Sequence, residues 1–183
     1  MSVFERLESE VRSYARAFPK TFDRAQGSRL STSEGEVYLD FLAGAGALNY
    51  GHNPEPMKKA LLAYLERGAI VHGLDLQTEA KAAFLEGFER HILAPRNLSY
   101  RFQFCGPTGT NAVEAALKLA RKATGRSSVL AFTNGFHGMT LGALAATGNV
   151  HHRSVYEPLL QGVQHAPFDG YYGPEIDTLA LLE

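Results

Sequence analysis

The sequence has a single cysteine, Cys105, and this scarcity limits its covalent and metal chemistry. One thiol cannot form an internal disulfide or a cluster of thiolate ligands, so the chain fits a reducing compartment and we expect a cytoplasmic protein. The seven histidines form no HExxH motif or other compact zinc-binding spacing. We therefore expect no metal site.

The sequence also lacks long apolar runs and a large excess of either positive or negative charge. No stretch of about 18 or more apolar residues occurs, and residues 1–18 are charged throughout, so neither a membrane-spanning helix nor a secretory signal is expected. The formal net charge is −1, and no basic run occurs that would bind nucleic acid or an anionic membrane. We expect a soluble protein without these partners.

Three familiar motifs are missing as well. The sequence lacks GxxxxGK[ST], which excludes a standard Walker loop, and it lacks the GxSxG of many hydrolases. The segment "AGAGALNYG" contains a GxG, but Gly51 follows Gly46 by five residues, where the dinucleotide fingerprint requires three. We interpret these glycines as a turn with close chain packing.

The composition is that of an ordinary globular protein, with 45% hydrophobic and 20% charged residues, and no repeat or linker divides it into independent domains. Apolar periodicity and capping residues predict helices and strands along the whole chain. The expected helices cover residues 3–17, 54–68, 77–92, 110–124 and 140–146, and the expected strands lie near 37–41, 100–105, 127–134 and 163–167.

Strands and helices alternate from about Tyr100 onward, which favours parallel βαβ units in a layered α/β domain. Ligands of such folds gather at the carboxyl ends of strands, where the loops enter the following helices. Two glycine-containing segments, "CGPTGT" at 105–110 and "NGFHGMT" at 134–140, are expected at such positions.

The first segment leads into a strongly helical pattern. A helix start offers free N–H groups and partial positive charge to an anion, and Gly106, Gly109 and Thr110 suit close approach of a ligand. Asn111 and Glu114 have the spacing of a capping box, although Thr108 or Thr110 is an alternative cap. The pattern therefore allows either a phosphate cradle or a merely well-capped helix.

The second segment places Phe136 and His137 between glycines directly after a strand. It is either a tight turn with a half-buried aromatic residue or a flat face on which a planar ligand stacks. Together the two segments describe a site for a phosphorylated aromatic ring, and pyridoxal 5′-phosphate fits. His72 and Asp75 lie in a polar turn that either lines a substrate pocket or is simply solvated.

Three longer motifs occur in the order and spacing of a known family: "YLDFLAGAGALNYGHNP", "PTGTNAVEAALKLARK" and "NGFHGMTLGALAATGN". Over nearly all its length the chain resembles the N-terminal part of a class III pyridoxal-phosphate aminotransferase. The resemblance implies a fold type I α/β architecture with a mostly parallel sheet. Residues 1–75 are expected to form the N-terminal segment and the start of the large domain, and residues 76–183 part of the cofactor-binding large domain. The resemblance also implies amino acids and oxo acids as substrates, and a homo-oligomer.

The resemblance assigns roles to individual residues. Gly109 and Thr110 match the phosphate-binding pair, and Thr108 stands where many relatives have Ser. Phe136 matches the aromatic residue that stacks on the pyridine ring, and His137 follows it as in the family. Asn111 replaces the Glu that is common in relatives, as one branch of the family does.

Transamination also needs a lysine that bonds to the cofactor and a carboxylate that keeps the pyridine nitrogen protonated. No lysine of the chain stands in the family's lysine context; the lysines are Lys20, Lys58, Lys59, Lys81, Lys118 and Lys122. The last residues resemble the start of a helix with Asp177 as its cap and Leu179 and Leu182 on one face. We therefore expect a longer polypeptide, and we expect residues 1–183 alone to be inactive. Two alternatives remain for the substrate and the function. One is a class III ω-aminotransferase that acts on ornithine, acetylornithine or 4-aminobutyrate, and the other is a non-catalytic phosphate-binding module.

Overall fold

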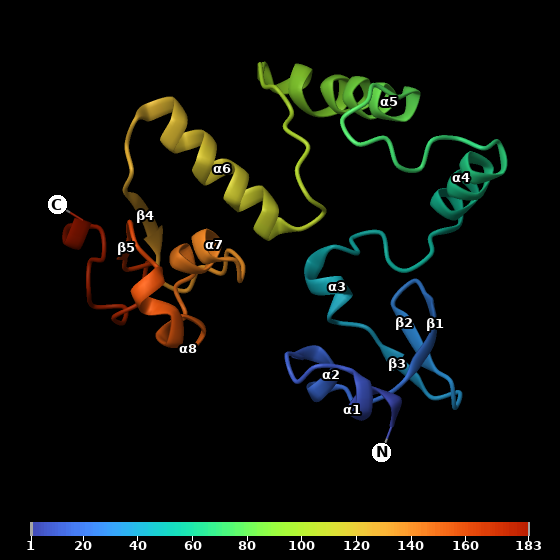
Figure 1. The fold of residues 1–183 in the computed structure, drawn as a ribbon, viewed down its shortest axis with the longest axis horizontal. Helices are drawn as coiled ribbons and strands as arrows, with labels where there is room; N and C mark the ends of the chain where they lie inside the picture. The colour runs from blue at the N-terminus through green and yellow to red at the C-terminus, as the bar shows by residue number, and fades with distance from the viewer. Residues whose placement is uncertain (1, 183) are drawn as a thin grey trace. The chain divides into compact units, whose positions relative to one another are not determined.

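The computed structural model describes residues 2–182, and the chain divides into two compact units, Met1–Asn97 and Leu98–Glu183 (Figure 1). The first unit contains α1 Val3–Leu7, α2 Tyr14–Ala17, β1 Phe22–Gln26, β2 Arg29–Thr32, β3 Val37–Leu39, α3 Ala43–Gly46, α4 Glu55–Glu66, α5 Glu79–Phe88, the π-helical turn Glu89–Leu93 and the 3-10 turn Ala94–Arg96. The second contains α6 Gly109–Thr124, β4 Val129–Phe132, α7 Leu141–Ala146, α8 Val150–Arg153, β5 Val163–Ala166 and the 3-10 turns Ser154–Leu159 and Ala180–Leu182. No helix in the described part of the chain is both long and apolar enough to cross a membrane.

The N-terminal helix expected over residues 3–17 is wrong in its extent. Two short helices, α1 and α2, form instead, and the backbone is extended at Glu8 between them. Ser2 and Glu5 make a capping box at the start of α1, but neither helix buries a residue. Because most helical stability comes from packing an apolar face, nothing here sustains a longer helix.

The strands of the first unit form an antiparallel sheet in the order β1–β2–β3. The strand expected near residues 37–41 is confirmed as β3, which pairs with β2 so that Leu30 lies opposite Tyr38. β1 was not predicted, because Phe22 and Ala25 are its only apolar residues and they do not alternate. Its place in the sheet comes from pairing with β2, where Gln26 lies opposite Arg29.

The glycine-rich segment 43–46, labelled α3, is a left-handed turn. The φ angles of its four residues are 47°, 59°, 56° and 86° in chain order. A Cβ atom on Gly51 would lie 2.9 Å from the carbonyl oxygen of Gly27, so the chains also approach closely there. The predicted turn with close chain packing is confirmed, since only a few residue types tolerate these dihedral angles and this contact.

The Asp40 carboxylate holds the start of this turn. Its Oδ1 accepts the N–H groups of Leu42 at 3.0 Å and Ala43 at 2.9 Å, and its Oδ2 lies 2.6 Å from Nε2 of His52. The Ala43 N–H, followed by His52 and the Leu42 N–H, lowers the pKa of Asp40 below its ordinary value. The ionised carboxylate therefore stabilises the folded turn.

Replacing this carboxylate is expected to cost stability in a pH-dependent way. A carboxyl group with a lowered folded-state pKa stabilises the fold above its unfolded-state pKa, near 4, and this contribution disappears as the pH falls through the lower folded-state value. Asp40→Asn should therefore lower the urea midpoint at pH 7, and its difference from the unmodified protein should shrink only as the pH falls below about 4. Asp23→Asn is the control, because Asp23 is exposed and contacts only its neighbour Arg24 among the ion pairs described. A loss for Asp40→Asn that stays the same from pH 7 to the acidic end of the range in which the protein is folded, below about pH 4, would contradict this assignment.

The two longer helices of the first unit follow the expected ranges closely. Pro54 is the N-cap of α4, and Gly68, just beyond its end, is in the left-handed region at φ 67°. The Asn53 side chain donates to the carbonyl oxygen of Ala25 at 2.9 Å. α5 begins after Thr78, whose hydroxyl accepts the Lys81 N–H at 3.2 Å.

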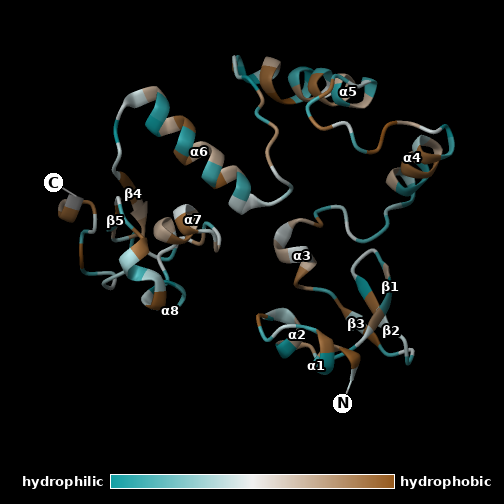
Figure 2. Cartoon of the chain, in the orientation of Figure 1, coloured by the Kyte–Doolittle hydropathy of each residue, from teal (hydrophilic) through white to brown (hydrophobic). Residues whose placement is uncertain are grey.

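The second unit places α6 and α7 beside a parallel strand pair. β4 and β5 run parallel, with Ala131 opposite His165, and α7 contains the buried residues Ala143–Ala146. Hydrophobic and hydrophilic residues alternate around α6 (Figure 2), as expected for an amphipathic helix. The predictions of α6, β4, α7 and β5, and of an α/β fold with parallel strands, are therefore confirmed.

The strand expected over residues 100–105 is wrong. This segment has no regular secondary structure, and within residues 2–182 the paired strands of the second unit are β4 and β5. A β-strand exists only through its neighbour, so an apolar, β-prone sequence is not sufficient when no strand lies beside it. The segment "CGPTGT" consequently does not follow a paired strand here, whereas "NGFHGMT" follows β4 as expected.

Candidate cofactor site

The start of α6 has free hydrogen-bond donors. Thr108 is the N-cap, and its Oγ1 accepts the Asn111 N–H at 3.1 Å, so the capping box expected from Asn111 and Glu114 does not form. Among the described residues, no acceptor faces the N–H groups of Gly109 and Thr110. Gly109 is exposed, and a Cβ atom there would meet no atom within 4 Å. This end of α6 can accept an anion through both N–H groups.

Gly106 has a different role from the one expected. A Cβ atom at this position would overlap the side-chain amide of Asn111, so the missing side chain makes room for a residue of the protein itself. Gly106 therefore shapes the loop before α6, and the open approach for a ligand lies at Gly109.

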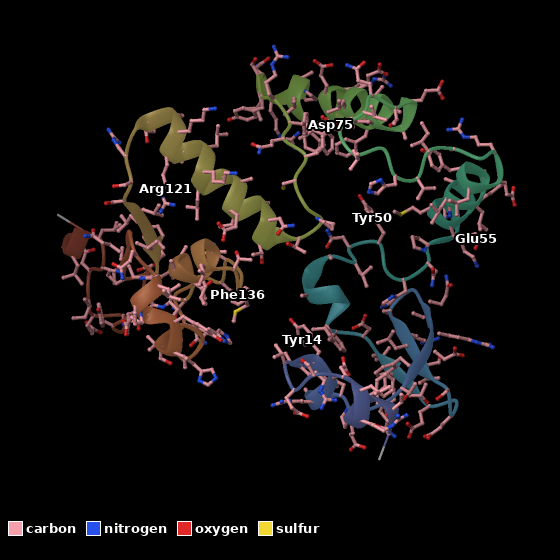
Figure 3. The ribbon with its side chains drawn as sticks, viewed as in Figure 1. Tyr14, Tyr50, Glu55, Asp75, Arg121 and Phe136 are labelled. Carbon is pink, nitrogen blue, oxygen red and sulfur yellow. The ribbon has the colours of Figure 1, made fainter. Side chains whose placement is uncertain are left out.

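The turn after β4 presents Phe136 and His137 in different directions. Phe136 is 64% exposed (Figure 3), and its ring makes an edge-to-face contact with His152 at a centroid distance of 6.1 Å. The half-buried His137 lines a mainly apolar pocket together with Val113 and Leu117 of α6. The exposed Phe136 ring offers a face to a planar ligand, whereas the His137 ring lines the apolar pocket.

The hydroxyl of Thr147, at the end of α7, fixes this turn. Thr147 is completely buried, and its Oγ1 accepts the His137 N–H at 3.0 Å. The same oxygen lies 3.2 Å from the carbonyl oxygen of Gly138 and 3.0 Å from that of Ala143, which it can reach as a donor. The Gly148 N–H also donates to the Gly135 carbonyl at 2.7 Å. Sequence reasoning missed Thr147, because a buried hydroxyl ten residues from its partner leaves no local pattern.

The two predicted segments meet at one point in the structure. Gly138 has a φ of 132°, and a Cβ atom on it would overlap the side chain of Thr110. Thr110 therefore lies directly against the turn that carries Phe136. The structure thus brings the free helix start and the exposed aromatic residue into one site.

Glu114 links α6 to the start of α7. Its Oε1 accepts the hydroxyl of Thr140 and, at 3.0 Å, the N–H of Ala143. The Thr140 hydroxyl and then the N–H groups of Ala143 and Gly142 lower the pKa of Glu114, and the charge of Arg121 acts in the same direction. Glu114 is therefore an ionised cap for α7, delivered from the neighbouring helix. The spacing of Asn111 and Glu114 in the sequence had instead indicated that Glu114 caps α6, the helix to which it belongs.

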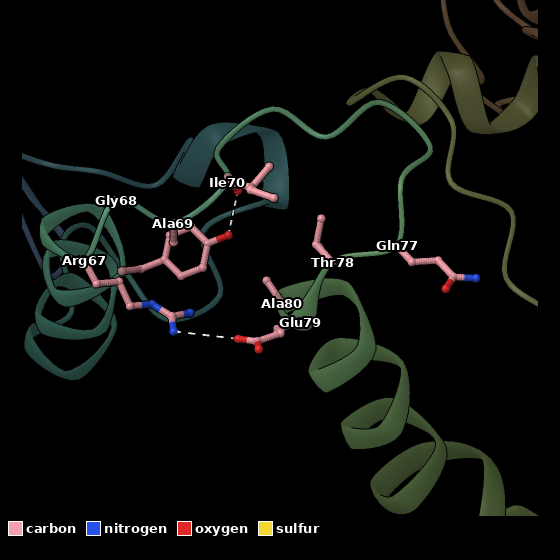
Figure 4. Close-up of a pocket in the computed structure, with 9 residues that line it drawn as sticks. Arg67, Gly68, Ala69, Ile70, Gln77, Thr78, Glu79 and Ala80 are labelled. Atoms are coloured by element: carbon pink, nitrogen blue, oxygen red, sulfur yellow. Dashed lines mark hydrogen bonds and ion pairs between the residues drawn. The ribbon is translucent and has the colours of Figure 1, made fainter.

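A separate pocket lies in the first unit (Figure 4), next to the turn that contains His72 and Asp75. Tyr64 donates its hydroxyl to the Ile70 carbonyl at 2.6 Å, and Arg67 lies 3.9 Å from the Glu79 carboxylate. Both His72 and Asp75 are exposed, and neither lines this pocket. The structure therefore favours the solvated turn over the substrate-pocket interpretation.

Comparisons with known proteins identify the family of this chain. The profile of the family described as aminotransferase class III matches residues 12–178. The diaminobutyrate–2-oxoglutarate transaminase of Vibrio cholerae serotype O1 is 59% identical over 183 residues, and that of Streptomyces anulatus is 61% identical over 184, each alignment covering 100% of this chain and 44% of the relative. The solved amine transaminase from an uncultivated Pseudomonas species, in a PLP-bound form, has a TM-score of 0.70 and 25% identity, and the match covers 91% of this chain and 38% of that one. This chain thus spans less than half the length of these relatives. Since the family profile matches nearly the whole chain, the chain belongs to the class III aminotransferase family.

Proposed function

We propose that the complete protein is a pyridoxal 5′-phosphate-dependent aminotransferase that transfers an amino group from L-glutamate to L-aspartate 4-semialdehyde. The products are L-2,4-diaminobutyrate and 2-oxoglutarate, and we place the reaction at the first step of ectoine biosynthesis. The observation that carries the substrate assignment is the 59–61% identity, over the whole chain, to relatives named diaminobutyrate–2-oxoglutarate transaminase.

The residues of the second unit fit the cofactor. The N–H groups of Gly109 and Thr110, with the Thr110 hydroxyl, would hold the phosphate, and the exposed ring of Phe136 would stack on the pyridine. Thr108 would contribute indirectly, because its hydroxyl caps α6 and so orients the first turn of the helix. His137 would contribute through the hydrogen bond from its backbone N–H to Thr147, which fixes the turn. When bound, pyridoxal 5′-phosphate supplies the electron sink that amino-group transfer requires.

No lysine in the described part of the second unit is suited to the reaction. Lys118 and Lys122 are exposed on α6, beyond its first two turns. The contribution of residues 1–183 is therefore to bind and orient the cofactor. We expect this segment alone to be inactive and the complete polypeptide to provide the lysine and the carboxylate.

The test is an amino-donor comparison with the complete polypeptide encoded by the gene. Purified with pyridoxal 5′-phosphate and supplied with 2-oxoglutarate, it should form glutamate from L-2,4-diaminobutyrate at least about tenfold more efficiently than from ornithine, which is one methylene longer. Efficiency is measured as kcat/KM for each donor. Preference for ornithine, acetylornithine or 4-aminobutyrate would overturn the substrate assignment. Cofactor binding without turnover of any donor would support the non-catalytic module.

Two further parts of the proposal depend on the family resemblance. We propose that the complete protein forms a homo-oligomer and that it works in the cytoplasm on free amino acids and oxo acids. The single exposed cysteine is compatible with a reducing compartment.

A further inference from the structure

Glu114 connects the two parts of the candidate site, the start of α6 and the turn that carries Phe136, although it lies in neither part. It lies in the second turn of α6, the helix whose first residues are Gly109 and Thr110. Its carboxylate bonds to Thr140 and to the Ala143 N–H, which belong to the start of α7. The loop entering α7 is the turn that carries Phe136. One side chain thus fixes the phosphate-binding helix relative to the aromatic turn.

The contact is close and specific. A Cβ atom on Gly142 would overlap a carboxylate oxygen of Glu114. The Glu114 carboxylate therefore packs directly against the backbone at the start of α7, where a side chain on residue 142 would displace it. The carboxylate is half-buried, and hydrogen bonds to ionised groups are stronger than those between neutral groups. Of the acidic residues in the described part of the second unit, Glu114 is the only one in α6.

We infer that Glu114 is a positioning residue: by holding the start of α7 against α6, it sets the distance between the Phe136 ring and the N–H groups of Gly109 and Thr110. The inference rests on the proposed binding of pyridoxal 5′-phosphate, because that ligand must satisfy both ends of the site at once. A ligand that occupies only the helix start, such as inorganic phosphate, does not depend on this distance.

The test measures binding to the complete polypeptide freed of cofactor. Glu114→Gln keeps the size of the side chain and removes its charge, whereas Thr140→Val and Thr140→Ser form a matched pair that removes or keeps the hydroxyl donor. Glu157→Gln is the surface control, because Glu157 is exposed in the 3-10 turn Ser154–Leu159 of the same unit. The readouts are the Kd of pyridoxal 5′-phosphate, the inhibition constant of inorganic phosphate competing with it, and the visible circular dichroism of the bound cofactor.

Glu114→Gln and Thr140→Val should each raise the Kd of pyridoxal 5′-phosphate about tenfold, the effect of losing one charge-assisted hydrogen bond. Both should alter the visible circular dichroism and leave the inhibition constant of phosphate unchanged. Thr140→Ser and Glu157→Gln should behave like the unmodified protein.

Three results would overturn the inference. Equal weakening of the cofactor and of inorganic phosphate would indicate a general structural role for Glu114. An unchanged Kd and spectrum in both Glu114→Gln and Thr140→Val would show that the contact does not set the distance. Failure of the unmodified polypeptide to bind pyridoxal 5′-phosphate would remove the proposed function together with this inference, whereas the first two results leave the proposed function intact.

Discussion

Gly138→Ala is expected to weaken the binding of pyridoxal 5′-phosphate by roughly 5- to 150-fold, which corresponds to the 1–3 kcal/mol that forcing extra atoms into a packed site costs. The new Cβ would overlap the side chain of Thr110, at the point where the start of α6 meets the turn that carries Phe136. Relief of the overlap must move either Thr110 or the Phe136 turn. Either movement changes the geometry that the cofactor requires.

Gly173→Ala provides the matched control for this substitution. Gly173 also has a positive φ, 102°, but a Cβ atom there would meet nothing within 4 Å. Both variants therefore strain the backbone, and only Gly138→Ala crowds the site. The Kd for the cofactor, measured by titration of the cofactor-free polypeptide, should change for Gly138→Ala alone. Equal Kd values for the two variants would show that Thr110 and the turn do not form one site.

Local sequence patterns predicted the elements whose stability is local. The helix over residues 110–124 combines a strong apolar stripe with candidate capping residues at its start, and these features identify it before any packing is known. β4 was recognised because it is a short apolar run that follows turn residues. Residues 100–105 show the limit of this reasoning, since the same composition forms a strand only where a partner strand is present.

The residues proposed to contact the cofactor could be identified from the sequence, whereas the residues that support the candidate site could not. Gly109 and Thr110 lie at the start of a helix, and Phe136 lies in the turn after a strand. Both kinds of position can be recognised from the local sequence. Glu114 and Thr147 act through hydrogen bonds to residues 26 and 10 positions away, respectively. A single sequence contains no signal for such contacts, and the expected capping box of Asn111 and Glu114 was wrong because Glu114 had a partner outside its own helix.

Thr147→Val is expected to lower the free energy of unfolding by about 1–3 kcal/mol, because it removes a buried hydroxyl while preserving the shape of the side chain. Valine cannot accept the His137 N–H or donate to the carbonyl oxygens of Gly138 and Ala143. Thr147 is completely buried, so water cannot replace these bonds without rearrangement. The turn that carries Phe136 should consequently open more often.

Two further variants separate this effect from a general loss of packing. Thr147→Ser keeps the hydroxyl and loses one methyl group, so the His137 amide should retain its protection from hydrogen exchange, which Thr147→Val should reduce. Thr124→Val removes an exposed hydroxyl that bonds the Ala120 carbonyl at 2.8 Å, and its effect on stability should stay within about 0.5 kcal/mol. The measurements are urea unfolding and amide hydrogen exchange of the complete polypeptide. If Thr147→Ser exposes the His137 amide as much as Thr147→Val does, the hydroxyl is not what holds the turn, and the position of Phe136 must depend on packing around α7 instead.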